Sequence, residues 1–301
     1  MRSLMLGDCD RYVSPYMRGV KQAMRLLGHQ HEEISIRSPA KVIEQRIRLW
    51  QPQIVWTHML LWPPTGSPPV AELVAIVERA EKRGAAVVIH DGDAKQSTRY
   101  PHDIGDWCSL ALVNHAYDRS AWGVPTLRWP YFAMAQSEIA APVDALRCEL
   151  FFAGTIGAEP VYAARSALLD ALRTAGAQLR MPKPGDNTLD RTAEIAASAE
   201  AVLGFGRPMI PGWVDTRVFQ YPGAGAVLLH DDVQGYLEPW VHFVPYRSGD
   251  AASVVDALAR MHALPESERR SMRRRAFDFV QERHSSVARV RQVLHQLELA
   301  S

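Results

Sequence analysis

The sequence predicts an α/β protein made of two Rossmann-like domains that face a central cleft. Short apolar runs alternate with amphipathic helical stretches along the chain, as in parallel sheets with right-handed crossovers. The 301 residues suit two domains of about 150 residues each. A stretch without a strong period, from about 131 to 147, separates the halves. We therefore expect domains at 1–140 and 141–301, with a last helix that can cross back to the first domain.

The N-terminal half is expected to follow strand-helix order from its first residues. The continuous apolar run 85–90 is typical of a strand buried on both faces. Gly28 and Gly84 are stop signals for two of the helices. Strands are expected at 2–6, 33–36, 54–58, 85–90, 110–114 and 125–129, and helices at 14–27, 38–50 and 70–83.

The C-terminal half repeats the same alternation. Strands are expected at 150–153, 177–181, 201–205, 226–230 and 242–245. Helices are expected at 161–174, 192–200, 218–221, 251–263 and 266–297, the last of them broken near Arg283 and His284. The carboxyl ends of both sets of strands would line the cleft, where open α/β sheets bind ligands.

Composition narrows the classes of protein. The net charge of +1 gives no global attraction for nucleic acid or an anionic membrane. Three cysteines without short spacing indicate reduced thiols rather than a disulfide framework or a cysteine zinc site. No signal peptide or apolar stretch of about 20 residues is found, so we expect a cytoplasmic protein without a membrane span.

The segment 204–232 contains the pattern most suggestive of chemistry. Arg217 begins a short helix, where free N–H groups and the helix dipole attract an anion, and its guanidinium can bind a diphosphate through two hydrogen bonds. Gln220 lies one helical turn later and can share that face. Gly223 and Gly225 let the backbone approach a ligand without an intervening Cβ. The alternative is that the glycines only turn the chain.

Three more residues are candidates for the same anion site. Gly154 and Thr155 close the first strand of the second half, and such a turn can present N–H groups to a phosphate. Arg207 lies in the loop after the strand expected at 201–205. A plain strand-to-helix turn and a solvated loop charge are the structural alternatives.

The N-terminal half offers polar residues at three strand ends. His90 and Asp91, with Asp93 two residues on, follow its most apolar strand. A strand-terminal Asp or His can act as general base on an acceptor hydroxyl. His58 ends another strand and Asp8 follows the first. Turn and capping roles are the alternative for these residues.

The second half resembles the donor region of GT-B glycosyltransferases, and most closely the CgeB-like (spore maturation protein) group. The likeness is clearest over about 150–297. The matching segments are Arg217-Val218-Phe219-Gln220, Pro222-Gly223-Ala224-Gly225, Val227-Leu228-Leu229 with Asp231-Asp232, and Gly235-Tyr236-Leu237-Glu238. The resemblance implies a nucleoside-diphosphate sugar whose phosphates face Arg217 and one of whose hydroxyls meets position 220. The family usually has Glu there, so Gln220 is a departure.

The resemblance therefore implies a glycosyltransferase that uses a UDP or GDP sugar as co-substrate, with no further cofactor and no metal, although Asp91 and Asp93 spell the metal-binding pattern of another glycosyltransferase fold. Arg217, with Arg207 or the amides of Gly154 and Thr155, would stabilise the leaving diphosphate. The acceptor is left open as a small molecule, a glycan or a modified nucleic acid. Three alternatives remain: a nucleotide-sugar epimerase, a non-catalytic binding protein, and an enzyme that glycosylates modified DNA bases.

Overall fold

The protein is an α/β molecule with two compact units. A computed structural model describes residues 1–8, 14–91, 107–114, 116, 123–157, 160–183, 186, 188–206 and 212–299. The first unit comprises Met1–Tyr131, Ile210–Gly212 and Ser286–Ser301, and the second comprises Phe132–Met209 and Trp213–Ser285. The predicted fold class, with alternating strands and helices in each half, is confirmed by the two parallel sheets.

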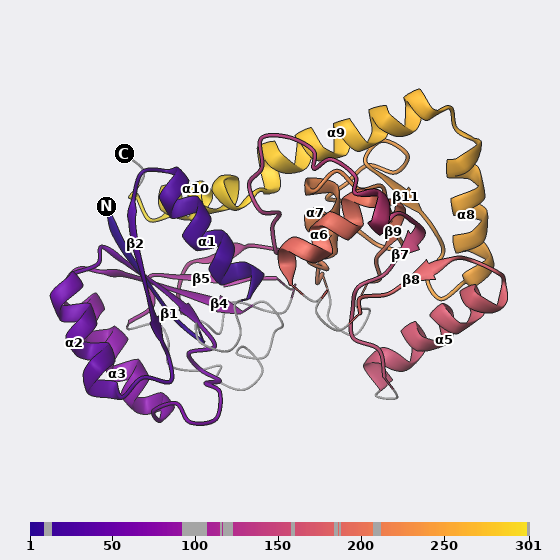
Figure 1. Ribbon diagram of the computed structural model, residues 1–301. Helices are drawn as coiled ribbons and strands as arrows, with labels where there is room; N and C mark the ends of the chain where they lie inside the picture. Colours follow the sequence, from indigo (N-terminus) through magenta and orange to yellow (C-terminus); the bar gives the residue numbers. More distant parts are fainter. Residues whose placement is uncertain are drawn as a thin grey trace. The chain divides into compact units, whose positions relative to one another are not determined.

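The first unit contains a six-stranded parallel sheet in the order β2-β1-β3-β4-β5-β6. Helices α1 and α10 cover one face of this sheet, and α2 and α3 cover the other (Figure 1). The bounds are β1 (Arg2–Gly7), α1 (Pro15–Leu26), β2 (Gln30–Ser35), α2 (Ala40–Trp50), β3 (Ile54–His58), α3 (Val70–Glu81), β4 (Ala86–Asp91), β5 (Leu110–Val113), β6 (Thr126–Arg128) and α10 (Ser286–Gln296).

Local signals explain where the first helix of this unit, α1, begins and ends. Ser14 accepts a hydrogen bond from the Met17 amide and caps α1, and Pro15 suits the first helical position because it needs no backbone donor there. Gly28 follows with a φ of +75°, a conformation that glycine adopts without a steric penalty. The apolar face of α1 buries Met17, Val20 and Met24.

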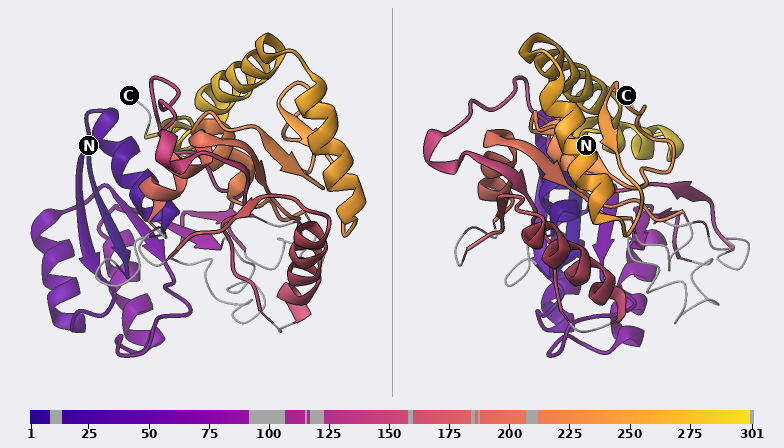
Figure 2. Two further views of the ribbon diagram at one scale, coloured as in Figure 1. Left: turned by 45° about the vertical axis from the view of Figure 1, so that its right-hand side comes forward. Right: turned by 90° about the vertical axis from the view of Figure 1, so that its right-hand side faces the viewer.

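The second unit contains a five-stranded parallel sheet in the order β11-β10-β9-β7-β8. Helices α5 and α8 pack on one face (Figure 2), and α6, α7 and α9 pack on the other. The bounds are η2 (Asp144–Leu146), β7 (Cys148–Phe151), α5 (Pro160–Thr174), β8 (Leu179–Arg180), α6 (Leu189–Ser198), β9 (Ala199–Leu203), α7 (Arg217–Gly223), β10 (Leu228–His230), β11 (Phe243–Pro245), α8 (Ala251–Ala263) and α9 (Glu266–His284).

Each unit has a topological switch point in its described part, where the helices that follow two neighbouring strands lie on opposite faces of the sheet. It falls between β1 and β3 in the first unit and between β7 and β9 in the second. Ligands of open α/β sheets bind beside the carboxyl ends of the strands at this point. The fold alone therefore directs attention to the residues after β1, β3, β7 and β9.

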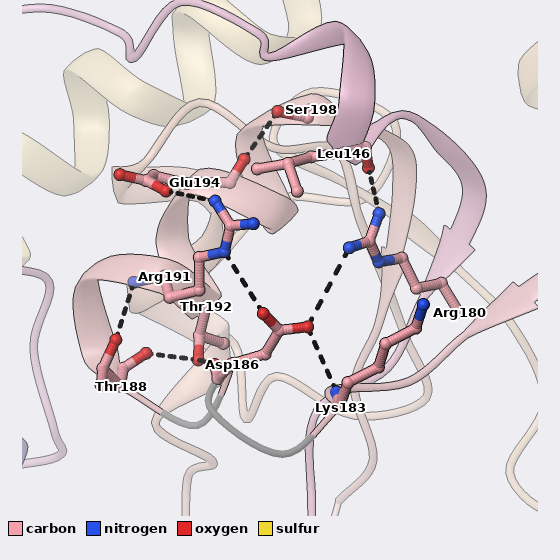
Figure 3. A network of polar contacts seen from close by, with 9 residues as sticks. All are labelled: Leu146, Arg180, Lys183, Asp186, Thr188, Arg191, Thr192, Glu194 and Ser198. Carbon is pink, nitrogen blue, oxygen red and sulfur yellow. Dashed lines mark hydrogen bonds and ion pairs between the residues drawn. The ribbon is translucent and has the colours of Figure 1, made fainter.

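A polar network around Asp186 fixes the start of α6 (Figure 3). The Asp186 carboxylate accepts hydrogen bonds from the Lys183 amide at 3.2 Å and from Nε of Arg191 at 3.3 Å. Thr188 caps α6 by accepting from the Arg191 amide at 3.2 Å. On the other side, Nη1 of Arg180 donates to the Leu146 carbonyl at 3.1 Å. The network ties the end of β8 to the beginning of the next helix.

Candidate functional site

Arg217 lies at the switch point of the second unit. Its guanidinium donates to the Ala153 carbonyl, just after β7, and forms an ion pair with the Asp215 carboxylate. It also lies 5.7 Å from the centre of the Phe152 ring. The Arg217 side chain is 19% exposed, whereas that of Asp215 is 1% exposed. The charge of Arg217 is thus held at the carboxyl edge of the sheet with part of its surface open.

The backbone amide of Arg217 is not free to bind an anion, although the sequence analysis expected free N–H groups at this helix start. It donates to Oδ1 of Asp215 at 2.9 Å, so this N–H group of the helix start is already satisfied. The helix itself, α7, has seven residues. The guanidinium, rather than the end of α7, is therefore the group that can meet an anion.

Gly154 and Thr155 lie beside Arg217, as the sequence analysis expected. A Cβ on Gly154 would come within 2.6 Å of Nη2 of Arg217 and of Cζ of Phe152, so only glycine leaves room for the guanidinium. Thr155 is exposed. Within the described part of the chain, the amides of Gly154, Thr155 and Ile156 make no hydrogen bond. Free N–H groups beside a guanidinium are suited to a phosphate.

A second arginine at this edge was not found from the sequence. Arg165, on α5, donates from Nη1 to the Thr155 carbonyl at 2.9 Å. Its guanidinium lies 5.4–5.7 Å from the centres of three aromatic rings, those of Phe152, Tyr162 and Phe205. The loop after β7 is therefore held between two cations. No local motif marks Arg165, because its ten-residue separation from Thr155 becomes proximity only in the folded sheet.

Gln220 lies one helical turn after Arg217, as expected, and is half-buried. No hydrogen bond of its side chain is found among the described residues. Its amide is therefore available to a ligand. The neighbouring Tyr221 is instead part of the protein interior, and burial raises the pKa of its hydroxyl to about 12, against the lowering effect of Arg217.

Gly223 and Gly225 have packing reasons for being glycine. A Cβ on Gly223 would collide with the Cβ of Ala133, and one on Gly225 would collide with the side chain of Ile139. Gly225 also has a φ of +89°, where other residues are strained. The space beside each glycine is thus occupied by a protein side chain. A contact of either glycine with the donor stays a prediction.

His230 is a further residue that the sequence analysis did not select. It ends β10, its side chain is fully buried, and its ring lies over the backbone of Gly204, where a Cβ would collide with it. Nδ1 accepts from the Asp232 amide at 3.0 Å. Nε2 is buried and has no hydrogen-bond partner among the residues that the structure describes. Its only sequence signal was a polar residue at the end of an apolar strand.

Asp231 has a structural role beside His230. Its carboxylate accepts from the Gly206 amide at 2.6 Å and from the Ser248 hydroxyl at 2.7 Å. Burial acts to raise its pKa, but the neighbouring His230 ring and the hydrogen bonds from Gly206 and Ser248 outweigh that effect, and the pKa lies below its usual range. Asp231 therefore anchors the chain after β9. The candidate Arg207, which follows Gly206, lies outside the described residues.

In the first unit, Asp8 and His58 come together at the switch point between β1 and β3. Arg37 binds the Asp8 carboxylate with two hydrogen bonds of 2.9 and 3.0 Å. Burial lowers the pKa of His58 to about 4, although nearby Asp8 acts to raise it. Met59, the next residue, has a φ of +61°, which is unusual for a residue with a side chain. Such backbone strain is found at functional sites.

His90 and Asp91 end β4, and strand alternation places their side chains on opposite faces of the sheet. The His90 ring is stacked on Tyr16 at a centroid distance of 4.1 Å and an interplanar angle of 5°. Burial lowers the pKa of His90 to about 3, with His58 adding to the effect. A neutral, buried histidine of this kind is a weak base at pH 7. Asp91 is 1% exposed, and Asp93 lies outside the described residues.

The described residues contain no group of three or more His, Cys, Asp or Glu side chains arranged to hold a metal ion. None of the described helices is both long and apolar enough to cross a membrane.

Comparison with a family model supports the same class of protein as the site. Residues 165–295 match the family described as Glycosyl transferase-like. This segment contains Arg165, Arg217, Gln220 and His230. The match confirms the prediction of a glycosyltransferase, and it does not distinguish the CgeB-like group within that class. A comparison with curated proteins finds no match.

Solved structures with the same fold are distant in sequence. Anabaena HepE, in complex with UDP and glucose, has a TM-score of 0.64 at 10% identity, covering 99% of both chains. An Escherichia coli structure described as trehalose-6-phosphate bound with UDP-2-fluoro glucose has a TM-score of 0.59 at 11% identity, covering 98% of this chain and 99% of that one. The DNA modifying enzyme β-glucosyltransferase has a TM-score of 0.53 at 9% identity, covering 99% and 98%. These likenesses confirm the predicted two-domain GT-B fold.

Proposed function

We propose that the protein transfers a hexose from a UDP-sugar to an acceptor hydroxyl, and that the donor phosphates bind at the carboxyl end of β7. The observation that carries this proposal is the partly exposed guanidinium of Arg217 beside the unused amides of Gly154 and Thr155. UDP is chosen as the nucleotide because the three solved structures described above were each determined with UDP or a UDP-sugar.

In the proposed reaction the bond between the sugar carbon C1 and the diphosphate oxygen breaks, and a bond from C1 to the acceptor oxygen forms. Negative charge then develops on the diphosphate, and Arg217 and the amides after β7 stabilise it. Asp215 is buried, and its ion pair with Arg217 keeps the guanidinium oriented. No metal ion is needed in this scheme, because fixed cations and N–H groups balance the charge.

Gln220 is proposed to orient the donor through hydroxyl groups of the ribose or the sugar. Its side-chain amide is free among the described residues and offers one acceptor and two donors. The Glu that is usual in the CgeB-like group would grip a diol more strongly. We propose membership of that group on the motif around Arg217, with the glutamine as a change that weakens the grip on the donor.

The acceptor proton is proposed to pass to Asp91. Of the other candidates in the first unit, Asp8 is already bound by Arg37, and burial lowers the pKa values of His58 and His90 to about 4 and about 3, so neither ring is a stronger base than a carboxylate. Asp91 remains as the carboxylate at the end of the most apolar strand.

The alternative of a modified DNA base as acceptor has one observation in its favour, the likeness to the DNA modifying enzyme β-glucosyltransferase. Three arginines of helix α9 do not add to it. Arg269 and Arg270 pair with Glu266, and Arg274 pairs with Asp278. Charges neutralised within the helix contribute little to phosphate-backbone binding. We therefore favour an acceptor that is not nucleic acid.

Thermal-shift measurements with UDP, GDP and their glucose conjugates test the proposed donor. A ligand at 100 times its Kd stabilises the fold by about 2.7 kcal/mol, so UDP and UDP-glucose should raise the Tm clearly while GDP should raise it little. Incubation with UDP-glucose and candidate acceptors, followed by UDP release, then tests transfer. Absence of any shift with all four nucleotides would contradict the proposal.

A further inference from the structure

A cavity lies in the second unit, at the edge of its sheet opposite to Arg217. Its volume is about 670 Å³, and its walls include Cys148 and Ala199, the first residues of β7 and β9. The strands of this sheet are parallel, so their amino ends lie away from the edge that holds Arg217. The cavity is therefore separate from the proposed donor site. Its other walls come from the end of α8 and from one face of α9.

Arg273 is the central cation of this cavity. It projects from α9, and its Nη2 donates to the carbonyls of Ala199 at 2.9 Å and Glu200 at 3.2 Å. No carboxylate forms an ion pair with it among the described residues, and its Nε and Nη1 make no hydrogen bond there. A guanidinium held in place by two carbonyls, with the donors on Nε and Nη1 unused, is prepared for an anion.

Two more arginines stand around Arg273. Arg269 lies one turn earlier on the same face of α9, and Arg147 precedes β7; both line the cavity. Burial lowers the pKa of Arg273, and the charges of Arg269 and Arg147 lower it further, whereas Glu266 and Glu200 oppose this. Like charges brought close together in this way favour a negatively charged occupant.

The carboxylates of the cavity wall are already engaged. Glu266 receives hydrogen bonds from Arg269, the shortest of 2.7 Å, and pairs with Arg270 at 3.2 Å. Glu200 contacts Nε2 of His262 at 2.7 Å. Glu149 accepts from the Gln178 amide at 2.8 Å. Of the three arginines that line the cavity, Arg273 is therefore the one that forms no ion pair with a carboxylate among the described residues.

We propose that this cavity binds the phosphate group of a small phosphorylated ligand through Arg273, with Arg269 contributing. The guanidinium edge matches two oxygens of one phosphate, and the volume leaves room for the rest of a metabolite. The site lies away from the reacting groups, so its occupant acts as a second ligand rather than as the sugar donor. The inference does not depend on the proposed transfer reaction.

Isothermal titration of the full chain with pyrophosphate, at ionic strength matched with NaCl, tests the site. To remove binding at the donor site, the titration is repeated in the Arg217→Ala background. We expect binding to persist in Arg217→Ala and to weaken at least tenfold in Arg273→Ala and in Arg269→Ala. Arg270→Ala is the matched control, because this arginine is on the same helix, pairs with Glu266 and does not line the cavity.

Arg273→Lys is a variant that controls for loss of folding, because lysine keeps the positive charge but lacks the planar guanidinium edge. It should bind pyrophosphate more weakly than the wild type while melting at a similar temperature. Wild-type affinity retained in Arg273→Ala, binding lost in Arg217→Ala instead, or no binding to the wild-type protein would each overturn the proposal.

Discussion

At the scale of single residues, the guanidinium of Arg217 is positioned by what surrounds it. Asp215 is buried and lies against it, so removal of the arginine would leave an unpaired carboxylate. Breaking such a pair costs about 3–5 kcal/mol. The same pair that holds Arg217 in place therefore also stabilises the second unit, and variants at this position need a separate measurement of stability.

Gly154→Ala is expected to weaken UDP binding at least tenfold. The added Cβ would lie 2.6 Å from Nη2 of Arg217 and from Cζ of Phe152, so the guanidinium or the ring must move. Overpacking of this kind costs about 1–3 kcal/mol of stability. Titration calorimetry with UDP and a melting curve measure the two effects.

Gly157→Ala is the control for that substitution. It lies in the same loop, and a Cβ there has no neighbour within 4 Å. This variant should bind UDP and melt as the wild type does. Equal UDP affinity for Gly154→Ala and the wild type would show that the donor phosphates do not bind beside Arg217.

His58 and His90 are expected to make the fold less stable in acid. The pKa values of the two side chains are lowered to about 4 and about 3 in the folded chain, mainly by burial. The unfolded chain binds protons at these groups below about pH 6.5, whereas the folded chain does not. Stability should therefore fall as the pH drops from 6.5, by about 2 kcal/mol for each histidine at pH 5.

Urea unfolding at pH 7 and pH 5 measures this loss. His90→Phe keeps a ring against Tyr16 and removes the titrating group, so its stability should change less between the two pH values. His295→Gln, at an exposed position of α10, should behave as the wild type. An unchanged pH dependence in His90→Phe would contradict the assignment of a buried, neutral histidine.

Residue patterns in the sequence predicted candidate residues that are marked by their neighbours along the chain. Arg217, Gly154 and Thr155 were selected from their places after strands and at a helix start, and the fold brings them together. Arg165 and His230 were missed because their partners, Thr155 and Gly204, are brought to them only by the pairing of strands and helices. Asp93 and Arg207 lie outside the described residues.

At the scale of elements, helix and strand signals predicted most of the bounds. The strand at 54–58 and the helix at 251–263 have the bounds expected from their periodicity and flanking residues. The bounds expected around the alanine-rich stretch 193–201, a helix at 192–200 and a strand from 201, differ from those observed, because this stretch contains no stop signal. There, α6 begins at Leu189 under the Thr188 cap, and β9 follows it directly at Ala199.

Helix α7 also differs from its expected range of 218–221. It extends from Arg217 to Gly223 and includes Pro222 in its last turn. The expected end at residue 221 comes just before Pro222, because proline has no amide hydrogen to continue the helix. Because Pro222 is the sixth of seven residues, only one helical amide is lost, and the amide of Ala224 still closes the turn on the Gln220 carbonyl.

Removal of α10, by ending the chain after Ser285, is expected to destabilise the first unit. The helix buries Val290, Val293 and Leu294, and its Arg289 carbonyl accepts from the Trp129 indole at 3.2 Å. Fully burying each such apolar side chain contributes about 1.5–3 kcal/mol. Hydrogen exchange should rise in α1, against which α10 packs (Figure 1).

A substitution at the exposed residue Gln292 is a suitable control for this truncation, since it leaves the apolar face of α10 in place. If the amides of α1 exchange at the same rate with and without α10, the last helix adds no stability to the first sheet.

At the scale of the whole molecule, strand-helix alternation predicted two parallel sheets, and both are observed. The order of the strands could not be read from the sequence, because it depends on the face onto which each helix folds back. That order creates the switch points, and these place Asp8 with His58 in one unit and Arg217 with Gly154 in the other. The candidate residues therefore lie where the topology of each sheet reverses.

The division into units places α10 with the first sheet, although it follows α9 of the second unit in the chain. The sequence break at Arg283 and His284 marked this change of element. The sequence analysis allowed for a last helix that crosses back to the first domain, although the apolar stripe of that helix by itself fits either sheet.

The central claim is that the Arg217 guanidinium binds the diphosphate of a UDP-sugar. Its most direct test is the affinity for UDP, measured by calorimetry, of the wild type, Arg217→Ala and Arg217→Lys, with Arg173→Ala as a control at an exposed arginine of α5. We predict that Arg217→Ala loses at least tenfold in affinity, that Arg217→Lys retains part of it, and that Arg173→Ala loses none. Wild-type affinity for UDP in a folded Arg217→Ala protein would contradict the claim.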